Sequence, residues 1–165
     1  MDEDATSDAT GLAAGLTVTR VQRPEQRLLA QLERYDFEAF GPTGLRTYDL
    51  AVMTEAGAIF VARLGDEIVG GCQLMRMLDE PGFLYVVGYY VRPAWRSRGV
   101  GRSFLAAMAA ETAKAGVEGL ILTCSPANVA AIALYESAGF VNERFIPDFY
   151  GEGEDRYILR WRFSQ

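Results

Sequence analysis

The chain contains no histidine, and this absence excludes a large part of enzyme chemistry. Serine–histidine and cysteine–histidine nucleophilic systems need an imidazole, as does nearly every ordinary zinc site. The only two cysteines, Cys72 and Cys124, lie inside apolar segments and lack the spacing of a paired motif. We therefore expect two buried free thiols, no disulfide framework and no metal, as in a protein of a reducing compartment.

Long hydrophobic runs and an excess of positive charge are also missing. No apolar run approaches the roughly 18 residues needed to span a bilayer, and the acidic, small-residue-rich beginning is unlike a signal peptide. A formal net charge of -6 argues against a general nucleic-acid binder, whose surface needs a dominant positive field. We expect a cytoplasmic protein that binds neither membranes nor nucleic acid.

The length and the apolar content indicate one globular domain. Half of the 165 residues are apolar, which is enough to bury a substantial core. Residues 1–15 mix small and acidic residues without periodicity and are typical of a mobile tail. The domain is therefore expected to cover residues 16–165.

Hydrophobic periodicity predicts the element order β-α-α-β-β-β-α-β-α-β-β. The expected strands are residues 16–22, 58–64, 68–77, 83–91, 118–124, 140–147 and 155–163. The expected helices are residues 24–40, 45–57, 100–116 and 126–138, the last with Ser125 as its cap and Gly139 after its end. The fold class is thus α/β (α+β), with a mixed central sheet of about seven strands.

The stretch YYVRPAWRSRGVGRSF, residues 89–104, joins an expected strand to an expected helix. A helix N-terminus exposes unpaired N–H groups that favour an anion, and Gly99 and Gly101 allow a phosphate to approach the backbone. The Walker pattern is absent, and GxGxxG fails because Phe104 replaces its third glycine. A glycine turn beside a solvated basic face is the alternative. The four arginines of this stretch are Arg92, Arg96, Arg98 and Arg102. Of these, Arg98 and Arg102 are expected to flank phosphates, and Arg92 is expected to be ordinary surface.

Two polar residues in the following helix region lie on one helical face. Asn128 and Tyr135 are seven residues apart, which is two helical turns. The alternative is an asparagine at the helix start and a tyrosine in the core. Gly88 in the preceding strand suggests a bulge or a close backbone approach, or else a packing glycine.

Together these residues make the chain resemble the GCN5-related N-acetyltransferase (GNAT) family over nearly its whole length. The family motif [QR]xxGx[GA] matches Arg96, Gly99 and Gly101, and NVAAIALYESAGF resembles the family's second conserved helix. The resemblance implies acetyl-CoA bound where strand 83–91 parts from strand 118–124, the fourth and fifth of the sheet. The cofactor-binding residues it implies are Tyr89, Tyr90, Val91, Arg96, Ser97, Arg98, Gly99, Val100, Gly101, Arg102 and Asn128.

The resemblance also implies a catalytic residue and an acceptor site. Tyr135 matches the position that protonates the departing thiolate. Phe149 and Tyr150 match an aromatic pair in the branch that acetylates protein N-termini, including the ribosomal-protein acetyltransferases, and are expected to bind the substrate. That branch often has a glutamate where this chain has Thr123, so the expected general base is missing. Four carboxylates remain as candidates: Glu38, Asp79, Glu80 and Asp148. The alternative is a proton relay through water by the tyrosines of strand 83–91.

The sequence therefore predicts an N-acetyltransferase that passes an acetyl group directly to a primary amine. At pH 7 an α-amine of pKa about 8 costs about 1.4 kcal/mol to deprotonate, against about 4.6 kcal/mol for a lysine near 10.4. A site without a strong base thus favours a peptide or protein N-terminus. The alternatives are a small-molecule amine, selected by residues 38–50, and a non-catalytic CoA-binding module. The sequence also leaves a homodimer open.

Overall fold

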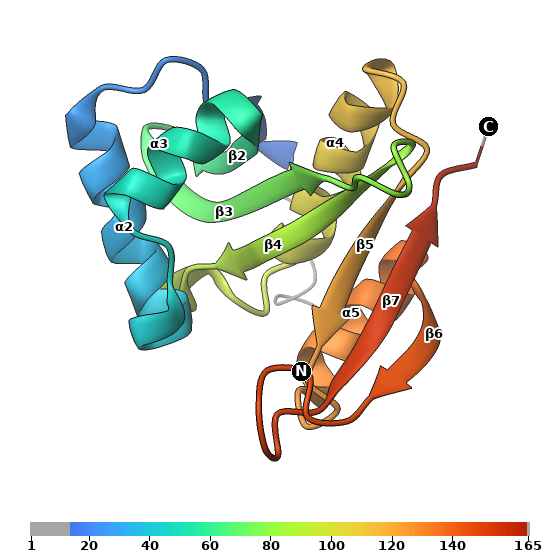
Figure 1. Ribbon diagram of the computed structural model, residues 1–165. Coiled ribbons are helices and arrows are strands. Elements are labelled where there is room, and N and C mark those ends of the chain that lie inside the picture. The colour runs from blue at the N-terminus through green and yellow to red at the C-terminus, as the bar shows by residue number, and fades with distance from the viewer. Residues whose placement is uncertain (1–13, 165) are drawn as a thin grey trace, which may run out of the picture. The chain divides into compact units, whose positions relative to one another are not determined.

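The computed structural model describes residues 14–164, and its elements follow the predicted order (Figure 1). The strands are β1 (Leu16–Arg20), β2 (Gly57–Leu64), β3 (Glu67–Arg76), β4 (Phe83–Val91), β5 (Gly119–Cys124), β6 (Val141–Ile146) and β7 (Arg156–Arg162). The helices are α2 (Gln26–Phe40), α3 (Thr47–Ala56), α4 (Val100–Lys114) and α5 (Val129–Ala138). The tail predicted over residues 1–15 lies outside the described residues, apart from its last two positions.

The strands form one mixed sheet with the order β1-β2-β3-β4-β5-β7-β6, which confirms the predicted α/β class. β4 and β5 run parallel, and their described ladder pairs Phe83–Tyr85 with Gly119–Ile121. β4 continues to Val91 and β5 to Cys124. The described ladder thus joins the first three residues of each strand, which makes β4 and β5 the parallel pair of the sheet.

The chain divides into two compact units. The first contains the described residues up to Met75 together with Val87–Met108, and the second contains Arg76–Val86 and the described residues from Ala109 onward. In the first unit, apolar residues of α2, α3, β2 and β3 share one core cluster, in which Leu32, Leu50, Ile59 and Val61 are at most 1% exposed. β4 and α4 each contribute residues to both units.

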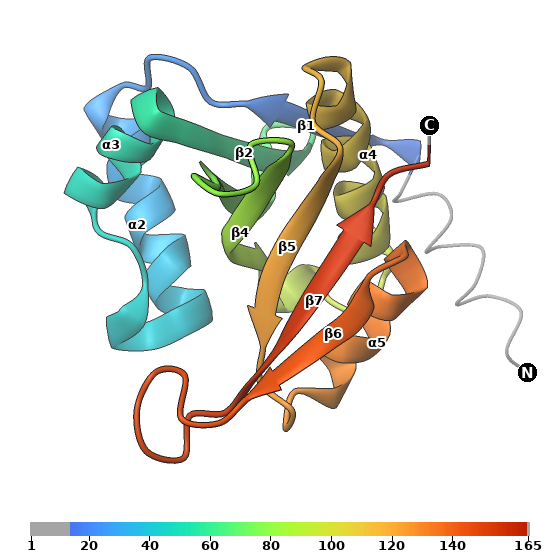
Figure 2. The same cartoon turned by 45° about the vertical axis from the view of Figure 1, so that its right-hand side comes forward.

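In the second unit, the alternation along β5 and β7 separates two faces of the sheet. Tyr135 of α5 packs on Phe140, and Phe140 packs on Trp161 of β7, with ring centroids 5.4 and 5.5 Å apart. Figure 2 shows α5 on one side of β6 and β7. Thr123 pairs with Ile158, three residues from Trp161, so its side chain points to the opposite face.

Helix α4 carries the apolar stripe that its sequence predicts. Val100, Phe104 and Met108 are each 0% exposed. The predicted stop at Gly116 is close to the observed end at Lys114, and Gly116 has a φ of 82°.

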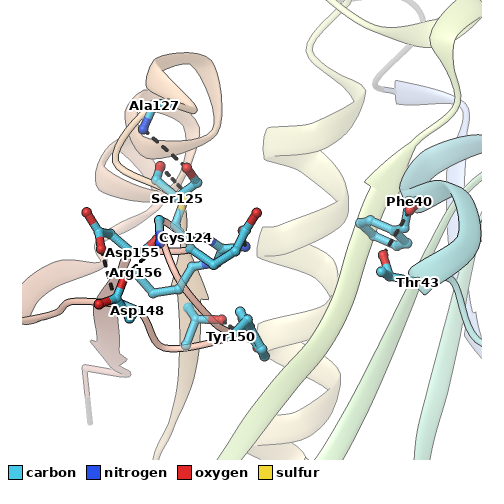
Figure 3. Close-up of polar contacts among 12 residues, drawn as sticks. Phe40, Thr43, Cys124, Ser125, Ala127, Asp148, Tyr150, Asp155 and Arg156 are labelled. Carbon is cyan, nitrogen blue, oxygen red and sulfur yellow. Dashed lines mark hydrogen bonds and ion pairs between the residues drawn. The ribbon is translucent and has the colours of Figure 1, made fainter.

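The start of α5 corrects one prediction. Asn128, not Ser125, is the N-cap, because its Oδ1 accepts the N–H of Ala131 at 3.2 Å. The Ser125 hydroxyl instead accepts the N–H of Ala127 at 3.3 Å, which closes a turn before the helix (Figure 3). Gly139 ends the helix with a φ of 114°, as expected.

Two strand glycines admit large side chains from neighbouring elements. A Cβ on Gly88 would lie 2.5 Å from Gln73 Oε1 and 3.2 Å from the ring of Phe40. A Cβ on Gly71 would lie 2.4 Å from the Tyr90 hydroxyl. Side chains therefore pack against Gly88, which matches the alternative of a packing glycine.

Both cysteines are buried and free, as predicted. Burial raises the pKa of the Cys72 thiol and that of the Cys124 thiol, so both remain protonated at neutral pH. None of the helices among residues 14–164 has the length and apolar character of a membrane span.

Candidate active site

The loop between β4 and α4 has the backbone of an anion-binding turn. Ser97 and Gly99 have positive φ values of 59° and 76°, and α4 begins at Val100. Positive φ is uncommon outside glycine, and successive N–H groups in such turns form concavities for anions. Arg96, Ser97, Arg98, Gly99 and Arg102 are all exposed. The backbone of this loop is therefore open to solvent, and its binding of a pyrophosphate stays a prediction.

Arg92 is a structural residue, which corrects the expectation that it is ordinary surface. Its Nε lies 3.3 Å from Glu38 and its Nη1 lies 3.2 Å from Glu67. Its guanidinium also stacks 4.0 Å from the ring centroid of Tyr35. Arg92 thus joins α2, β3 and the end of β4.

The side chains of the other three arginines of the loop differ in their contacts. Arg96 Nε donates to the carbonyl of Val91 at 2.9 Å, so this side chain folds back onto the end of β4. The Arg98 guanidinium lies 5.6 Å from the ring of Trp95. Arg102 lies exposed in the first turn of α4. Arg98 and Arg102 are consequently the arginines best placed to flank a phosphate.

The two tyrosines at the end of β4 point to opposite sides of the strand. Tyr89 Oη donates to the carbonyl of Gly101 at 2.6 Å, and its ring lies 5.2 Å from Phe104. Tyr90 is 4% exposed and its ring fills the space above Gly71. Burial raises the pKa of the Tyr90 hydroxyl far above its ordinary value. The side chain of Tyr90 therefore belongs to the core, and only its backbone is available to a ligand.

Tyr135 and Asn128 lie in the second unit, whereas residues 89–102 lie in the first. Tyr135 is 9% exposed and packs on Phe140. Asn128 is exposed and caps α5 through its side chain. The position of Tyr135 matches the alternative of a tyrosine in the core, and that of Asn128 matches the alternative of an asparagine at the helix start. The roles of both residues toward acetyl-CoA stay predictions.

Thr123 lies between two tyrosine hydroxyls. Its Oγ1 is 3.2 Å from Tyr85 Oη on β4 and 3.3 Å from Tyr150 Oη in the β6–β7 turn. Tyr85 and Thr123 are half-buried, and Tyr150 is 60% exposed. Burial raises the pKa of Tyr85 to about 12, so its hydroxyl stays protonated. Thr123, where the resemblance led us to expect a glutamate, is thus the middle of three neighbouring hydroxyls.

The turn that carries Phe149 and Tyr150 is held by its own carboxylates. Asp148 Oδ1 accepts the N–H of Gly153 at 2.7 Å, and Asp155 Oδ1 accepts the N–H of Asp148 at 3.0 Å (Figure 3). The rings of Phe149 and Tyr150 meet edge to face at 4.7 Å. This turn presents both predicted substrate-binding rings at the surface.

Three of the four carboxylates considered as bases have structural partners. Glu38 pairs with Arg92, and Asp148 holds the β6–β7 turn. Glu80 accepts two hydrogen bonds from Arg160, at 2.7 and 2.9 Å, and these lower its pKa. Asp79 is exposed in the segment between β3 and β4. A carboxylate with a lowered pKa is a weak base, so Glu80 is poorly suited to accept a proton.

A buried carboxyl that the sequence analysis missed lies in α2. Asp36 is 0% exposed, and it accepts the N–H of Leu45 at 3.3 Å and Gln73 Nε2 at 2.7 Å. Burial raises its pKa to about 6. Asp36 follows Leu29 by seven residues on the apolar face of the helix, and this spacing could have revealed it.

We predict an unusual pH dependence of stability from Asp36. Because its pKa rises from 3.8 to about 6 on folding, its contribution is present below pH 3.8 and is lost as the pH rises through 6. The loss corresponds to about 3 kcal/mol in the free energy of unfolding. Asp36→Asn removes this titration, and an asparagine can donate to Gln73 Oε1, for which the described residues provide no hydrogen-bond partner.

Urea unfolding of the unmodified protein and of Asp36→Asn at pH 4 and pH 7.5 measures the contribution of Asp36 to stability. The stability of Asp36→Asn relative to the unmodified protein should increase between the two pH values. Packing losses are the same at both pH values, so the comparison contains its own control. A relative stability independent of pH would contradict a raised pKa.

Comparison with known proteins decides the family. Residues 25–140 match the sequence pattern of the Acetyltransferase (GNAT) family. The chain belongs to this family. The GNAT match contains Arg96, Gly99, Gly101 and the whole of α5, so it covers the motifs on which the resemblance was based.

Two relatives are similar to large parts of the chain, and one of them is named as an acetyltransferase. An uncharacterised protein of Mycobacterium leprae (strain TN) is 34% identical over 133 residues, which are 79% of this chain and 36% of that protein. The chain thus spans about a third of that relative's length. Aminoglycoside N(6')-acetyltransferase type 1 of Stenotrophomonas maltophilia is 37% identical over 93 residues, 51% of this chain and 60% of that protein.

The fold is likewise that of a solved GNAT enzyme. The ribosomal-protein-S18-alanine N-acetyltransferase of Escherichia coli superposes with a TM-score of 0.73 at 22% identity, covering 91% of this chain and 95% of that one. The predicted likeness to the ribosomal-protein branch is therefore confirmed at the level of fold. The acceptor of this chain is a separate question.

Proposed function

We propose that the protein is an acetyl-CoA-dependent N-acetyltransferase whose acceptor is a primary amine of low pKa, in the first place a peptide or protein N-terminus. The observation that carries the acceptor class is the neutral surrounding of Thr123, where two tyrosine hydroxyls take the place of a carboxylate. Family membership supports the acetyl transfer itself.

The β4–α4 loop supplies the donor side of the proposed site. N–H groups from Ser97 to Arg102 bind the pyrophosphate, helped by the positive end of the α4 dipole. Backbone groups from Tyr89 to Val91 bind the pantetheine arm. The hydrogen bond from Tyr89 to Gly101 fixes the strand end against the first turn of the helix, so both sets of groups are pre-positioned.

Tyr135 supplies the proton of the departing thiolate. When the amine nitrogen bonds to the acetyl carbon, the C–S bond breaks and the sulfur takes the phenol proton, which water later replaces. A phenol of pKa about 10 is protonated at neutral pH and can therefore act as this acid. The packing of Tyr135 on Phe140 restricts its ring and supports a fixed direction of donation.

The acceptor side favours an amine that is partly neutral in solution. Glu38, Glu80 and Asp148 are held in structural contacts, so a strong base is lacking among these candidates. An α-amine with pKa about 8 is deprotonated far more often at pH 7 than a lysine at about 10.4. The exposed pair Phe149 and Tyr150 can contact a peptide beside its terminal nitrogen.

A small-molecule amine is the second candidate. The Stenotrophomonas relative, named as an aminoglycoside acetyltransferase, favours it over the half of the chain that it covers. Residues 38–50 would then decide the acceptor, because they join α2 to α3 and include the exposed side chains of Phe40 and Tyr48.

An acceptor panel tests the proposal by measuring release of the CoA thiol. Peptides with a free N-terminus should have a kcat/KM about 200-fold above that of N-terminally blocked peptides with an internal lysine, from the difference in neutral amine. Turnover confined to lysines, polyamines or aminoglycosides would overturn the peptide proposal. Binding of acetyl-CoA without turnover of any amine would indicate a non-catalytic module.

A further inference from the structure

The hydroxyls of Tyr85, Thr123 and Tyr150 form a continuous chain on one face of the second unit. Their oxygens are separated by 3.2 and 3.3 Å, and in each pair either oxygen can be the donor. The chain begins at a half-buried tyrosine on β4 and ends at a tyrosine that is 60% exposed. It therefore leads from the sheet to solvent.

The geometry points to this chain as the path by which the acceptor amine loses its proton, with Thr123 as the positioning residue that connects the two tyrosines. The inference rests on the proposed function, since it requires an amine acceptor.

The path moves a proton without forming an ion on the protein. As the N–C bond forms and the C–S bond breaks, the amine nitrogen gives a proton to Tyr85 Oη. Tyr85 gives its own proton to Thr123 Oγ1, Thr123 gives its proton to Tyr150 Oη, and Tyr150 releases one to water. Each hydroxyl ends as it began, so no phenolate forms at Tyr85, whose raised pKa disfavours it.

The sheet separates this path from the proton donor of the thiolate. Tyr135 packs through Phe140 on Trp161, on the face of the second unit that α5 covers. Thr123 and its partners lie on the opposite face, as the register of β5 and β7 requires. The proton that leaves the nitrogen and the proton that reaches the sulfur thus follow different routes. One transfer therefore does not reverse the other.

The surroundings of the outer end keep Tyr150 in place. The Arg156 guanidinium lies 4.9 Å from the Tyr150 ring and pairs with Glu154 at 2.9 Å. Phe149 contacts the same ring edge to face. These two ring contacts restrict the directions in which the hydroxyl can point, and this favours the bond to Thr123.

Two substitutions of Thr123 separate its hydroxyl from its shape. Thr123→Val keeps the volume and removes the hydroxyl, and Thr123→Ser keeps the hydroxyl. With a free-N-terminus peptide, Thr123→Val should lower kcat about 100-fold, the lower end of the range for a proton-transfer group. The acetyl-CoA Kd should remain unchanged, and Thr123→Ser should restore most of the rate. The matched control is Thr112→Val, another threonine of this unit, whose hydroxyl donates to the carbonyl of Ala109.

A proton inventory, the rate in mixtures of H₂O and D₂O, distinguishes a proton path from a merely structural bond. The unmodified protein should give a curved plot, because several protons move together, and Thr123→Val should give a linear one. If Thr123→Val has the normal kcat and the same curvature, the path is wrong although the proposed function stands. If the unmodified protein acetylates no amine, it is the proposed function that fails.

Discussion

Tyr135→Phe should lower kcat by about 100-fold or more while the Kd for acetyl-CoA remains unchanged. The substitution removes one oxygen and preserves the ring that packs on Phe140. General acid catalysis by a positioned side chain contributes about 10²- to 10⁴-fold, and a thiolate leaving without a proton loses that contribution. Steady-state rates with saturating acceptor and calorimetric titration of acetyl-CoA measure the two quantities.

Tyr48→Phe is the matched control for this prediction. Tyr48 is 78% exposed on α3 and loses the same oxygen in the variant. It should retain the normal kcat with a peptide acceptor. A Tyr135→Phe protein with normal kcat would show that another group, or water, protonates the thiolate.

Gly99→Val should weaken acetyl-CoA binding by about 10- to 100-fold. Gly99 has a φ of 76°, a conformation that a β-branched residue adopts only under strain. Relaxing that strain turns loop N–H groups away from the pyrophosphate, and one hydrogen bond to a charged group contributes about 1.5–3 kcal/mol. The valine methyls would also occupy the space through which a phosphate approaches the backbone.

Gly65→Val is the matched control for Gly99→Val, because it places a valine at a positive φ outside the β4–α4 loop. Gly65 has a φ of 57° in the β2–β3 turn, and a Cβ there would meet nothing within 4 Å. Both variants should lose stability in urea, but only Gly99→Val should lose affinity for acetyl-CoA. Normal binding by Gly99→Val would refute the role given to the β4–α4 loop.

The fold was predictable because its signals are local. The periodicity of α4, the hairpin of β2 and β3, and the glycine at the end of α5 each specify an element within a short window of sequence. The error at Ser125 has the same local origin, since serine, proline and asparagine are all good residues at a helix start. Only the bond from Ala131 to Asn128 decides among them.

The site was less predictable, because its important contacts join distant parts of the chain. Arg92 was taken for ordinary surface, yet its partners Glu38 and Glu67 lie 54 and 25 residues away. Thr123 was recognised only as a departure from relatives, because Tyr85 and Tyr150 are 38 and 27 residues from it. Pairings of this kind depend on strand register and turn shape, which composition and periodicity do not specify.

The strand glycines also determine where this sequence can change during evolution. A methyl group on Gly71 would overlap the ring of Tyr90, and one on Gly88 would overlap Gln73, so alanine at either position requires compensating changes elsewhere. The turn of residues 147–154 is exposed throughout, and substitutions of its side chains disturb little of the core. On the proposed function, acceptor preference can therefore diverge rapidly between descendants of this protein while the strands beside the acetyl-CoA loop stay nearly invariant.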